Sequence, residues 1–432
     1  MKQQTPFWNR MQALVKNEAR FHVPGHKGNP AAIPPFGGIL RYDMTEVEGA
    51  DDLSHPTDTL AQSQQNMARL YGSGATLYSA SGSTSCIQAM LTLFVKPEET
   101  VVMARGCHVA AIRALGFIGA VPHWVYPAAP LPTAAEIEAA LAQSHAKAVY
   151  LTSPDYEGNI ADIAAIAAVC HGAGAVLLVD NAHGAHLKFL RPDIHPITLG
   201  ADATADSAHK TLPCLTPAAM LHLKNGQLAA AGRAALNLYS STSPSYLVLQ
   251  SLDIAAGMLA TQPPNFMQTA AQLAAAIAAV PHLVQLGADP LKLCLTPWRG
   301  GWQTSTVTAA LQTAGILPEL ADERRIVLMA SPYNQPEDFA LLAKVLAPFT
   351  PRPPLPLPAL PVIRPKAVCS IRSAMFAPAK TVPVQTAPGQ VMAGLFAPCP
   401  PGVPLVMPGE ELCQEAAKLL AAGGILTVDV LK

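Results

Sequence analysis

Residues 176–186 read VLLVDNAHGAH, and residues 206–212 read DSAHKTL. The first segment predicts a buried strand of apolar residues that ends at Asp180. Burying a carboxylate at a strand end is costly unless a cation pairs with it. Lys210 follows 30 residues later, between hydroxyl and imidazole side chains that could hold it beside a phosphate. These two segments therefore predict a strand end and a later turn that form one charged site.

A buried carboxylate and a lysine in this setting suit pyridoxal phosphate (PLP). Lys210 would form the Schiff base with the cofactor. Asp180 would keep the pyridine nitrogen protonated, so that the ring can accept electrons. The alternative is that Asp180 caps a turn and that Lys210 is an ordinary surface lysine. On these two segments alone the two interpretations have equal weight.

Residues 76–91, TLYSASGSTSCIQAML, predict a strand, a turn of small residues and a helix. Gly82, Ser83, Thr84 and Ser85 would lie at the helix start, where free backbone N–H groups and hydroxyls bind anions. The alternative is a serine N-cap with a tight turn. A P-loop is excluded because no Gly-Lys-Ser/Thr follows.

Further segments carry unusual polar residues. His108, in ARGCHVA, follows a predicted strand and could stack on a cofactor ring, although a lone loop histidine is more often a polar surface residue. STSPSY at 241–246 places hydroxyls before a helix, either as a cap or as phosphate donors. FHVPGHKG at 21–28 and DMTEVEGADDL at 43–53 are unusual for structural loops, with a turn and a solvated loop as the alternatives.

Short apolar runs alternate with alanine-rich helical stretches through the first half of the chain. The predicted strands are residues 100–103, 148–151, 175–179 and 218–223, and the predicted helices between them include 134–142 and 160–171. This alternation predicts an α/β fold whose mostly parallel sheet is covered on both faces. Ligands of such sheets bind beyond the carboxyl ends of the strands.

Composition excludes several classes of protein. The chain has 432 residues, 50% of them hydrophobic, and a net charge of -1, so it can bury a large core and is not an electrostatic binder of nucleic acid. Its apolar runs are shorter than the roughly 20 residues of a membrane span. The polar N-terminus predicts no signal peptide and hence a cytoplasmic protein. The eight cysteines show no C-x-x-C pair, so we expect no metal site.

The sequence predicts five parts in the chain. They are an N-terminal arm (1–30), a large PLP-binding domain (31–265), a small α+β subdomain (266–346), a proline-rich linker (347–365) and a C-terminal domain (366–432). The linker follows from PRPPLPLPALPVIRP at 351–365, which can be neither a helix nor a central strand. A helix at 410–422 and a strand at 425–431 are predicted to end the chain.

Many motifs stand in one order along the chain. They are PGHKG, DxTE-x-x-G-x-DDL, SGSTS, R-x-CH, DNAHGAH, SAHKT, STSPSY and PCPPGVPLVMPGE. From about Phe21 to Glu411 this order resembles the Orn/Lys/Arg decarboxylase family, in the short form that begins directly at the PLP domain. The resemblance implies a fold type I PLP enzyme of the aspartate-aminotransferase superfamily, with a transferase-like large domain and a smaller α+β C-terminal domain.

The resemblance also implies roles for individual residues. Lys210 would carry the cofactor, and Asp180 would hold the pyridine nitrogen. Ala182 and His108 would pack on the two ring faces, with His183 close by. The phosphate would be held by Gly82, Ser83, Thr84, Ser207 and His209. Ser241 and Thr242 would reach the phosphate of a neighbouring subunit, because members of this fold are homodimers, or higher oligomers, with shared active sites.

The C-terminal half departs from the family's pattern. Cys399 replaces the tyrosine of the family's usual P-Tyr-P-P-G motif, and Ser373 stands where a glutamate is common. This half helps to shape the substrate pocket, so the departures concern the substrate more than the cofactor.

The expected reaction is decarboxylation of arginine, lysine or ornithine to the amine and CO2. Either Lys210 or His183 would return a proton to the α carbon. The alternatives are another PLP reaction on the same fold, such as transamination, desulfuration or aldol cleavage, and a non-catalytic PLP-fold protein. A carboxylate should bind the distal cation of the substrate. The candidates are Glu46, Asp51, Asp52, Asp155, Glu157 and Glu319.

Overall fold

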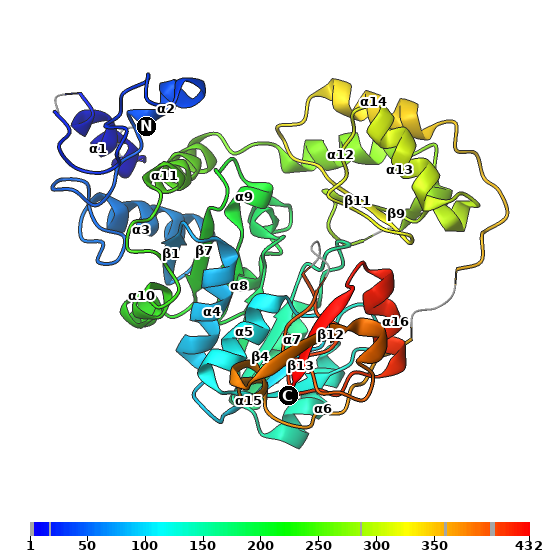
Figure 1. The fold of residues 1–432 in the computed structure, drawn as a ribbon. Coiled ribbons are helices and arrows are strands. Elements are labelled where there is room, and N and C mark those ends of the chain that lie inside the picture. Colours follow the sequence, from blue (N-terminus) through cyan, green and yellow to red (C-terminus); the bar gives the residue numbers. More distant parts are fainter. Residues whose placement is uncertain (1–3, 17–18, 286, 358–360, 398–401) are drawn as a thin grey trace.

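The computed structural model describes residues 4–16, 19–285, 287–357, 361–397 and 402–432. A seven-stranded sheet forms its centre (Figure 1). In spatial order its strands are β1 (Ala75–Ser79), β7 (Ala219–Leu223), β6 (Ala203–Asp206), β5 (Val176–Asp180), β4 (Ala148–Thr152), β2 (Thr100–Ala104) and β3 (Val121–Val125). Of these strands β7 alone runs antiparallel to its neighbours, so the predicted mostly parallel sheet is confirmed.

Helices cover both faces of this sheet, and the alternation of β5 shows why. Leu178 packs into a core with helices α4 and α5, whereas Leu177 and Val179 pack into a second core with α6 and α7. A third core, under α3 and α11, covers the β1–β7 end of the sheet. The helices around the sheet are α3 (Thr59–Tyr71), α4 (Gly82–Phe94), α5 (Val109–Ile118), α6 (Ala134–Ser144), α7 (Ile163–Gly172), α8 (Pro196–Leu199), α9 (Ala208–Thr211), α10 (Ala229–Asn237) and α11 (Tyr246–Thr261).

A smaller antiparallel sheet stands to the upper right of the large one in Figure 1. Its order is β10 (Leu320–Ala321), β11 (Ile326–Met329), β9 (Lys292–Leu295) and β8 (Val284–Gln285). It packs against α12 (Phe266–Ile277), α13 (Thr304–Thr313) and α14 (Pro336–Leu346). The mixture of strands and helices expected for this part of the chain is present, and the domain boundaries themselves stay predictions.

The proline-rich segment forms neither helix nor strand in its described residues, 351–357 and 361–365. It contacts the 3₁₀ turn Pro297–Gly300 that follows β9, where the Leu355 N–H donates to the carbonyl of Trp298 at 2.8 Å. The chain then returns to the large sheet and forms α15 (Ile371–Phe376), β12 (Ala379–Pro383), α16 (Gln414–Ala422) and β13 (Thr427–Leu431). Strands β12 and β13 pair antiparallel.

Two of the expected element bounds are wrong by a few residues at the C-terminus. The last helix begins at Gln414 rather than 410, because Glu410 and Glu411 form β-bridges and Cys413 caps the helix. The last strand begins at Thr427 rather than 425, because the Ile425 N–H still bonds to Leu420 and closes the helix.

The remaining elements are short. They are α1 (Pro6–Leu14), α2 (Gly37–Leu40) and the 3₁₀ turns Pro34–Phe36, Ala185–Phe189, Gly226–Leu228, Pro281–Leu283, Pro297–Gly300 and Val384–Thr386. Among the described residues no helix has both the length and the apolar character needed to span a membrane.

Candidate active site

Asp180 ends β5 and is 1% exposed. Its Oδ1 accepts the Ala182 N–H at 3.1 Å, and its Oδ2 accepts the Tyr150 hydroxyl at 3.2 Å from the neighbouring strand. Burial raises the pKa of Asp180, and the nearby His108, the Ala182 N–H and the Lys210 side chain only partly oppose this shift. The hydrogen-bond donors of this carboxylate are neutral groups. A protonated ring nitrogen would supply the positively charged partner that a buried carboxylate needs.

Lys210 lies on the one-turn helix α9, and its Nζ is 3.0 Å from Nε2 of His183. His183 follows Asp180 by three residues and is buried. Burial, reinforced by the charges of Lys292 and Lys210, lowers the pKa of His183 well below its usual value. His183 is therefore neutral, and its Nε2 accepts a hydrogen bond from the lysine ammonium.

The predicted phosphate turn lies at the start of α4, a helix of 13 residues. Gly82, Ser83 and Thr84 form its first turn. The Ser207 hydroxyl, three residues before Lys210, donates to Ser83 Oγ at 2.7 Å. The structure thus brings the two predicted phosphate-binding segments together, and a helix N-terminus with hydroxyls fits an anion.

His108 caps the N-terminus of α5, where its Nδ1 accepts the Ala110 N–H at 3.2 Å. Burial lowers the pKa of His108, although the charge of Asp180 opposes the shift. The neutral ring therefore carries its proton on Nε2. A Cβ added at Gly402 would lie 2.8 Å from this Nε2, so the C-terminal segment closes directly over His108.

Other predicted cofactor residues occupy different surroundings. Ala182 is buried beside Asp180, as expected for a residue that packs on the ring. His209 Nδ1 lies 2.8 Å from the Ala218 carbonyl, so one ring nitrogen is already engaged. Ser241 and Thr242 lie exposed on the loop between α10 and α11. Their predicted contact with a neighbouring subunit stays a prediction.

Two patterns of one protein family match this chain. The pattern of the Orn/Lys/Arg decarboxylase major domain matches residues 5–279, and that of the C-terminal domain of the same family matches residues 360–422. The chain belongs to the Orn/Lys/Arg decarboxylase family. It is accordingly a PLP-dependent amino acid decarboxylase of fold type I, which confirms the expected family, fold, enzyme class and cofactor.

Two relatives align along almost their whole length. An uncharacterized protein of Bacillus subtilis, YaaO, is 31% identical, over 96% of this chain and 94% of its own. An arginine decarboxylase of Halalkalibacterium halodurans is 29% identical, over 96% of this chain and 92% of its own. A lysine decarboxylase of Pseudomonas aeruginosa is 26% identical over 57% of this chain and 39% of its own.

Solved structures of the family share the fold. The lysine decarboxylase of Francisella novicida superimposes with a TM-score of 0.81 at 16% identity, covering 99% of this chain and 81% of that one. The constitutive lysine decarboxylase of Escherichia coli gives a TM-score of 0.77 at 18% identity, covering 99% and 82%.

Sequence reasoning missed a second group of residues in this decarboxylase. Tyr156 lies edge-on to the His183 ring with centroids 4.8 Å apart, and its hydroxyl donates to Glu319 Oε1 at 2.5 Å. Lys292, on β9, is buried and donates to the Asp155 carbonyl at 2.7 Å. Burial lowers the pKa of Lys292 to about 8. The polar residues in YEGN and DPLKL were the available signal, but nothing in the sequence joined these segments.

The six candidate carboxylates differ in how fully they are engaged. Asp51 accepts four backbone N–H groups, those of Asp52, Thr57, Asp58 and Leu60. Asp155 accepts the N–H groups of Glu157 and Asn159 and the Asn159 amide. Both therefore organise turns, and a role for either of them in binding the distal cation stays a prediction.

The other four carboxylates are engaged by side chains or by a single backbone amide. Glu157 binds Arg325 and Gln285, and Asp52 accepts the Ser54 N–H beside His55. Glu46 is bound by the hydroxyls of Thr45 and Ser243. Glu319 is held by the neutral Tyr156 hydroxyl, and it is exposed.

The two departures noted in the C-terminal half have different outcomes. Ser373 lies in the first turn of α15, where its hydroxyl contacts that of Ser370 at 2.8 Å. The N-cap of this helix is Ser370, and nothing in the structure explains a serine rather than a glutamate at position 373. Cys399 lies outside the described residues.

Proposed function

We propose that this enzyme decarboxylates a basic amino acid and that arginine is its preferred substrate. The observation that carries the proposal is a line of contacts from Lys210 to His183, from His183 to Tyr156 and from Tyr156 to Glu319. This line leads from the lysine that would hold the cofactor to a carboxylate on the second sheet. A substrate with a charged group at each end fits such a site.

The residues described above fit the cofactor. Lys210 would be the attachment lysine, Asp180 would hold the ring nitrogen, and Ala182 and His108 would pack on the ring. Gly82, Ser83 and Thr84 at the start of α4, together with Ser207 and His209, would bind the phosphate. When bound, PLP supplies an electron sink for the electron pair that the departing carboxylate leaves behind.

His183 and Lys210 handle the proton that replaces the carboxylate. The two nitrogen atoms are 3.0 Å apart, so a proton on Lys210 Nζ is shared with the neutral His183 Nε2. Either atom can deliver it to the α carbon. The edge of Tyr156 shields His183 from solvent on one side, which keeps the proton at this pair.

Glu319 is the proposed partner of the distal cation. Among the described residues Glu319 accepts a hydrogen bond from a neutral hydroxyl, and Lys292 lies near enough for its pKa to respond to the Glu319 charge. The carboxylate keeps its negative charge available to a substrate cation. A guanidinium can bind a carboxylate through two parallel N–H groups, which favours arginine over lysine. The relatives that align over nearly their whole length include arginine decarboxylases, which supports the same preference for arginine over lysine.

The test is a panel of amino acids incubated with the PLP-loaded enzyme, in which CO2 and amine are measured together. We expect both products from arginine, less from lysine and ornithine, and none from small neutral amino acids. Stoichiometric CO2 without preference for a basic side chain would contradict the substrate assignment. A keto acid or a cleavage product without CO2 would contradict the reaction.

A further inference from the structure

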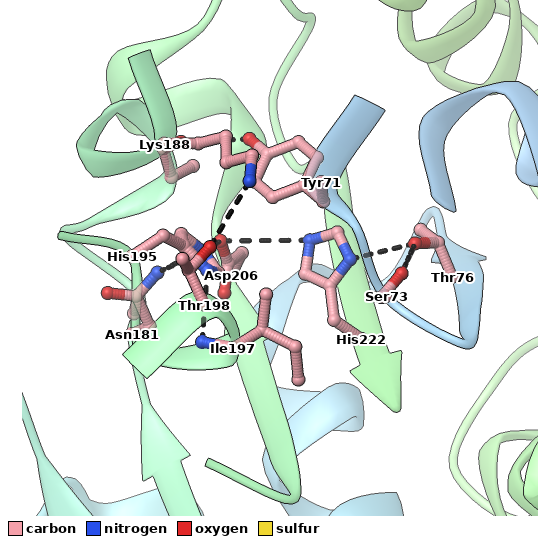
Figure 2. A network of polar contacts seen from close by, with 12 residues as sticks. Tyr71, Ser73, Thr76, Asn181, Lys188, His195, Ile197, Thr198, Asp206 and His222 are labelled. Atoms are coloured by element: carbon pink, nitrogen blue, oxygen red, sulfur yellow. Dashed lines mark hydrogen bonds and ion pairs between the residues drawn. The ribbon is translucent and has the colours of Figure 1, made fainter. Parts of the chain in front are cut away.

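A buried polar network spans neighbouring strands of the large sheet, and the proposed reaction does not use its residues (Figure 2). Asp206, the last residue of β6, accepts at Oδ2 both His195 Nε2–H at 2.8 Å and the Asn181 amide at 2.9 Å. His222 on β7 lies 3.8 Å from the same oxygen, and its Nδ1 is 2.8 Å from the hydroxyl of Thr76 on β1. The network therefore joins four neighbouring strands, β1, β7, β6 and β5.

The network lies on the face of the sheet opposite Asp180. Asp180 pairs with Ala205, whose side chain points to the core that contains α4. Asp206 is the next residue on β6, so its side chain points to the other face. The side chains of Asn181, His195, Asp206 and His222 are almost fully buried there. The network thus lies at the active-site edge of the sheet, on the face opposite Asp180.

A His–Asp–His group of this kind can bind a metal, but the hydrogen bonds argue against it. His195 Nδ1 accepts the Ile197 N–H at 3.2 Å. The neutral ring must then carry its proton on Nε2, which has no lone pair left for a metal. Burial also lowers the pKa of His222 to about 3, so this ring is neutral too. Asp206 is held by neutral donors, as in a structural network.

The network is connected to both halves of the cofactor site through the backbone. Asn181 follows Asp180, and Asp206 precedes Ser207. The Asn181 side chain also supports the turn that carries His183. A Cβ at Gly184 would lie 1.9 Å from Asn181 Oδ1, so this turn closes directly on the amide. One carboxylate therefore links the Asp180–His183 turn to the Ser207–Lys210 turn.

We propose that Asp206 is a positioning residue, which with Asn181 and His195 fixes the distance between Asp180 and Lys210 and so orients the cofactor ring. The inference rests on the proposed roles of Asp180 and Lys210. Its consequence is that loss of Asp206 changes the orientation and affinity of bound PLP, not only the stability of the fold.

The test compares Asp206→Ala with Asp206→Asn. We expect the alanine variant to raise the PLP dissociation constant at least about tenfold and to change the visible circular dichroism per bound cofactor. The asparagine variant should restore most of both properties, since its amide oxygen still accepts both hydrogen bonds. If Asp206→Ala does not fold, Asn181→Ala, which removes one donor to the same oxygen, should show the same change in dichroism.

Asp202→Ala is the matched control. Asp202 precedes the opposite end of β6 and also binds a histidine, His171, at 3.0 Å. This control should leave dichroism and affinity within about twofold of wild type.

Three outcomes would decide against the network or the site. Unchanged dichroism and affinity in the folded Asp206 or Asn181 variant would overturn the positioning role. A stoichiometric metal in the purified protein would overturn it as well, since the His195 tautomer would be wrong. Failure of the wild type to bind PLP through Lys210 would instead overturn the proposed site.

Discussion

At the scale of single residues, the proposed electron sink depends on the charge of Asp180. Asp180→Asn should still bind PLP but lose turnover by a factor on the order of 10²–10³, because a neutral amide cannot stabilise a protonated ring nitrogen. Turnover and cofactor absorbance measured on one sample separate the two effects.

Tyr150→Phe is the matched control for this change. It removes a hydrogen bond to Asp180 and keeps the charge, so its loss should stay below about tenfold. Equal turnover of Asp180→Asn and wild type would show that another acid holds the ring.

If Glu319 binds the distal cation as proposed, it sets the affinity for the side chain of the substrate. Glu319→Gln should raise KM for arginine about tenfold or more while kcat and the cofactor spectrum change little, since a charge-assisted hydrogen bond contributes roughly 1.5–3 kcal/mol. Steady-state kinetics measure this split. Glu337→Gln, an exposed carboxylate in the first turn of α14, should behave as wild type. An unaltered KM in Glu319→Gln would move the distal site to another residue or to a neighbouring subunit.

At the scale of elements, a buried ion pair helps to hold the C-terminal segment on the large sheet. Arg105, just after β2, binds both oxygens of Glu410, at 2.7 and 2.6 Å, and the Leu405 carbonyl. Glu410 is only 5% exposed. Because the same segment closes over His108, this pair connects stability to the cofactor site.

Glu410→Gln should therefore lower the free energy of unfolding by about 3 kcal/mol, because it leaves a buried guanidinium without its counter-charge. Urea unfolding measures the change. Glu411→Gln, the partly buried neighbour, is the control and should differ from wild type by less than about 0.5 kcal/mol. A loss in Glu410→Gln no larger than in this control would show that packing alone holds the segment.

The sequence predicted elements where periodicity and turn chemistry agree. The strand ending in Asp180 and the helix starting at Gly82 are both confirmed, since each combines an apolar pattern with polar residues at one end. Helix α7 begins at Ile163, three residues later than expected, because Asp162 caps it. Contacts between distant segments could not be predicted. Tyr156 and Glu319 are 163 residues apart, and nothing local in either segment indicates the other.

At the scale of the whole molecule, we expect a homodimer in which Ser241 and Thr242 of one subunit reach the phosphate site of the other. Thr242→Asp should then be inactive, because it places a carboxylate against the phosphate. Mixing it with inactive Lys210→Ala should restore about a quarter of wild-type activity, since half the dimers would hold one intact site. Activity of the mixture measures this. Two inactive variants that never complement would contradict shared sites.

Lys210 is proposed to hold the cofactor, and the site of covalent attachment tests this proposal directly. The PLP-loaded enzyme is reduced with borohydride and digested, and the modified peptide is identified by mass. Lys292 is the structural rival, because it is buried near the site and has a pKa of about 8. We expect the pyridoxyl group on Lys210, and we expect folded Lys210→Ala to lose both this group and the visible absorbance. A pyridoxyl group on Lys292, or an absorbance that survives in Lys210→Ala, would contradict this proposal.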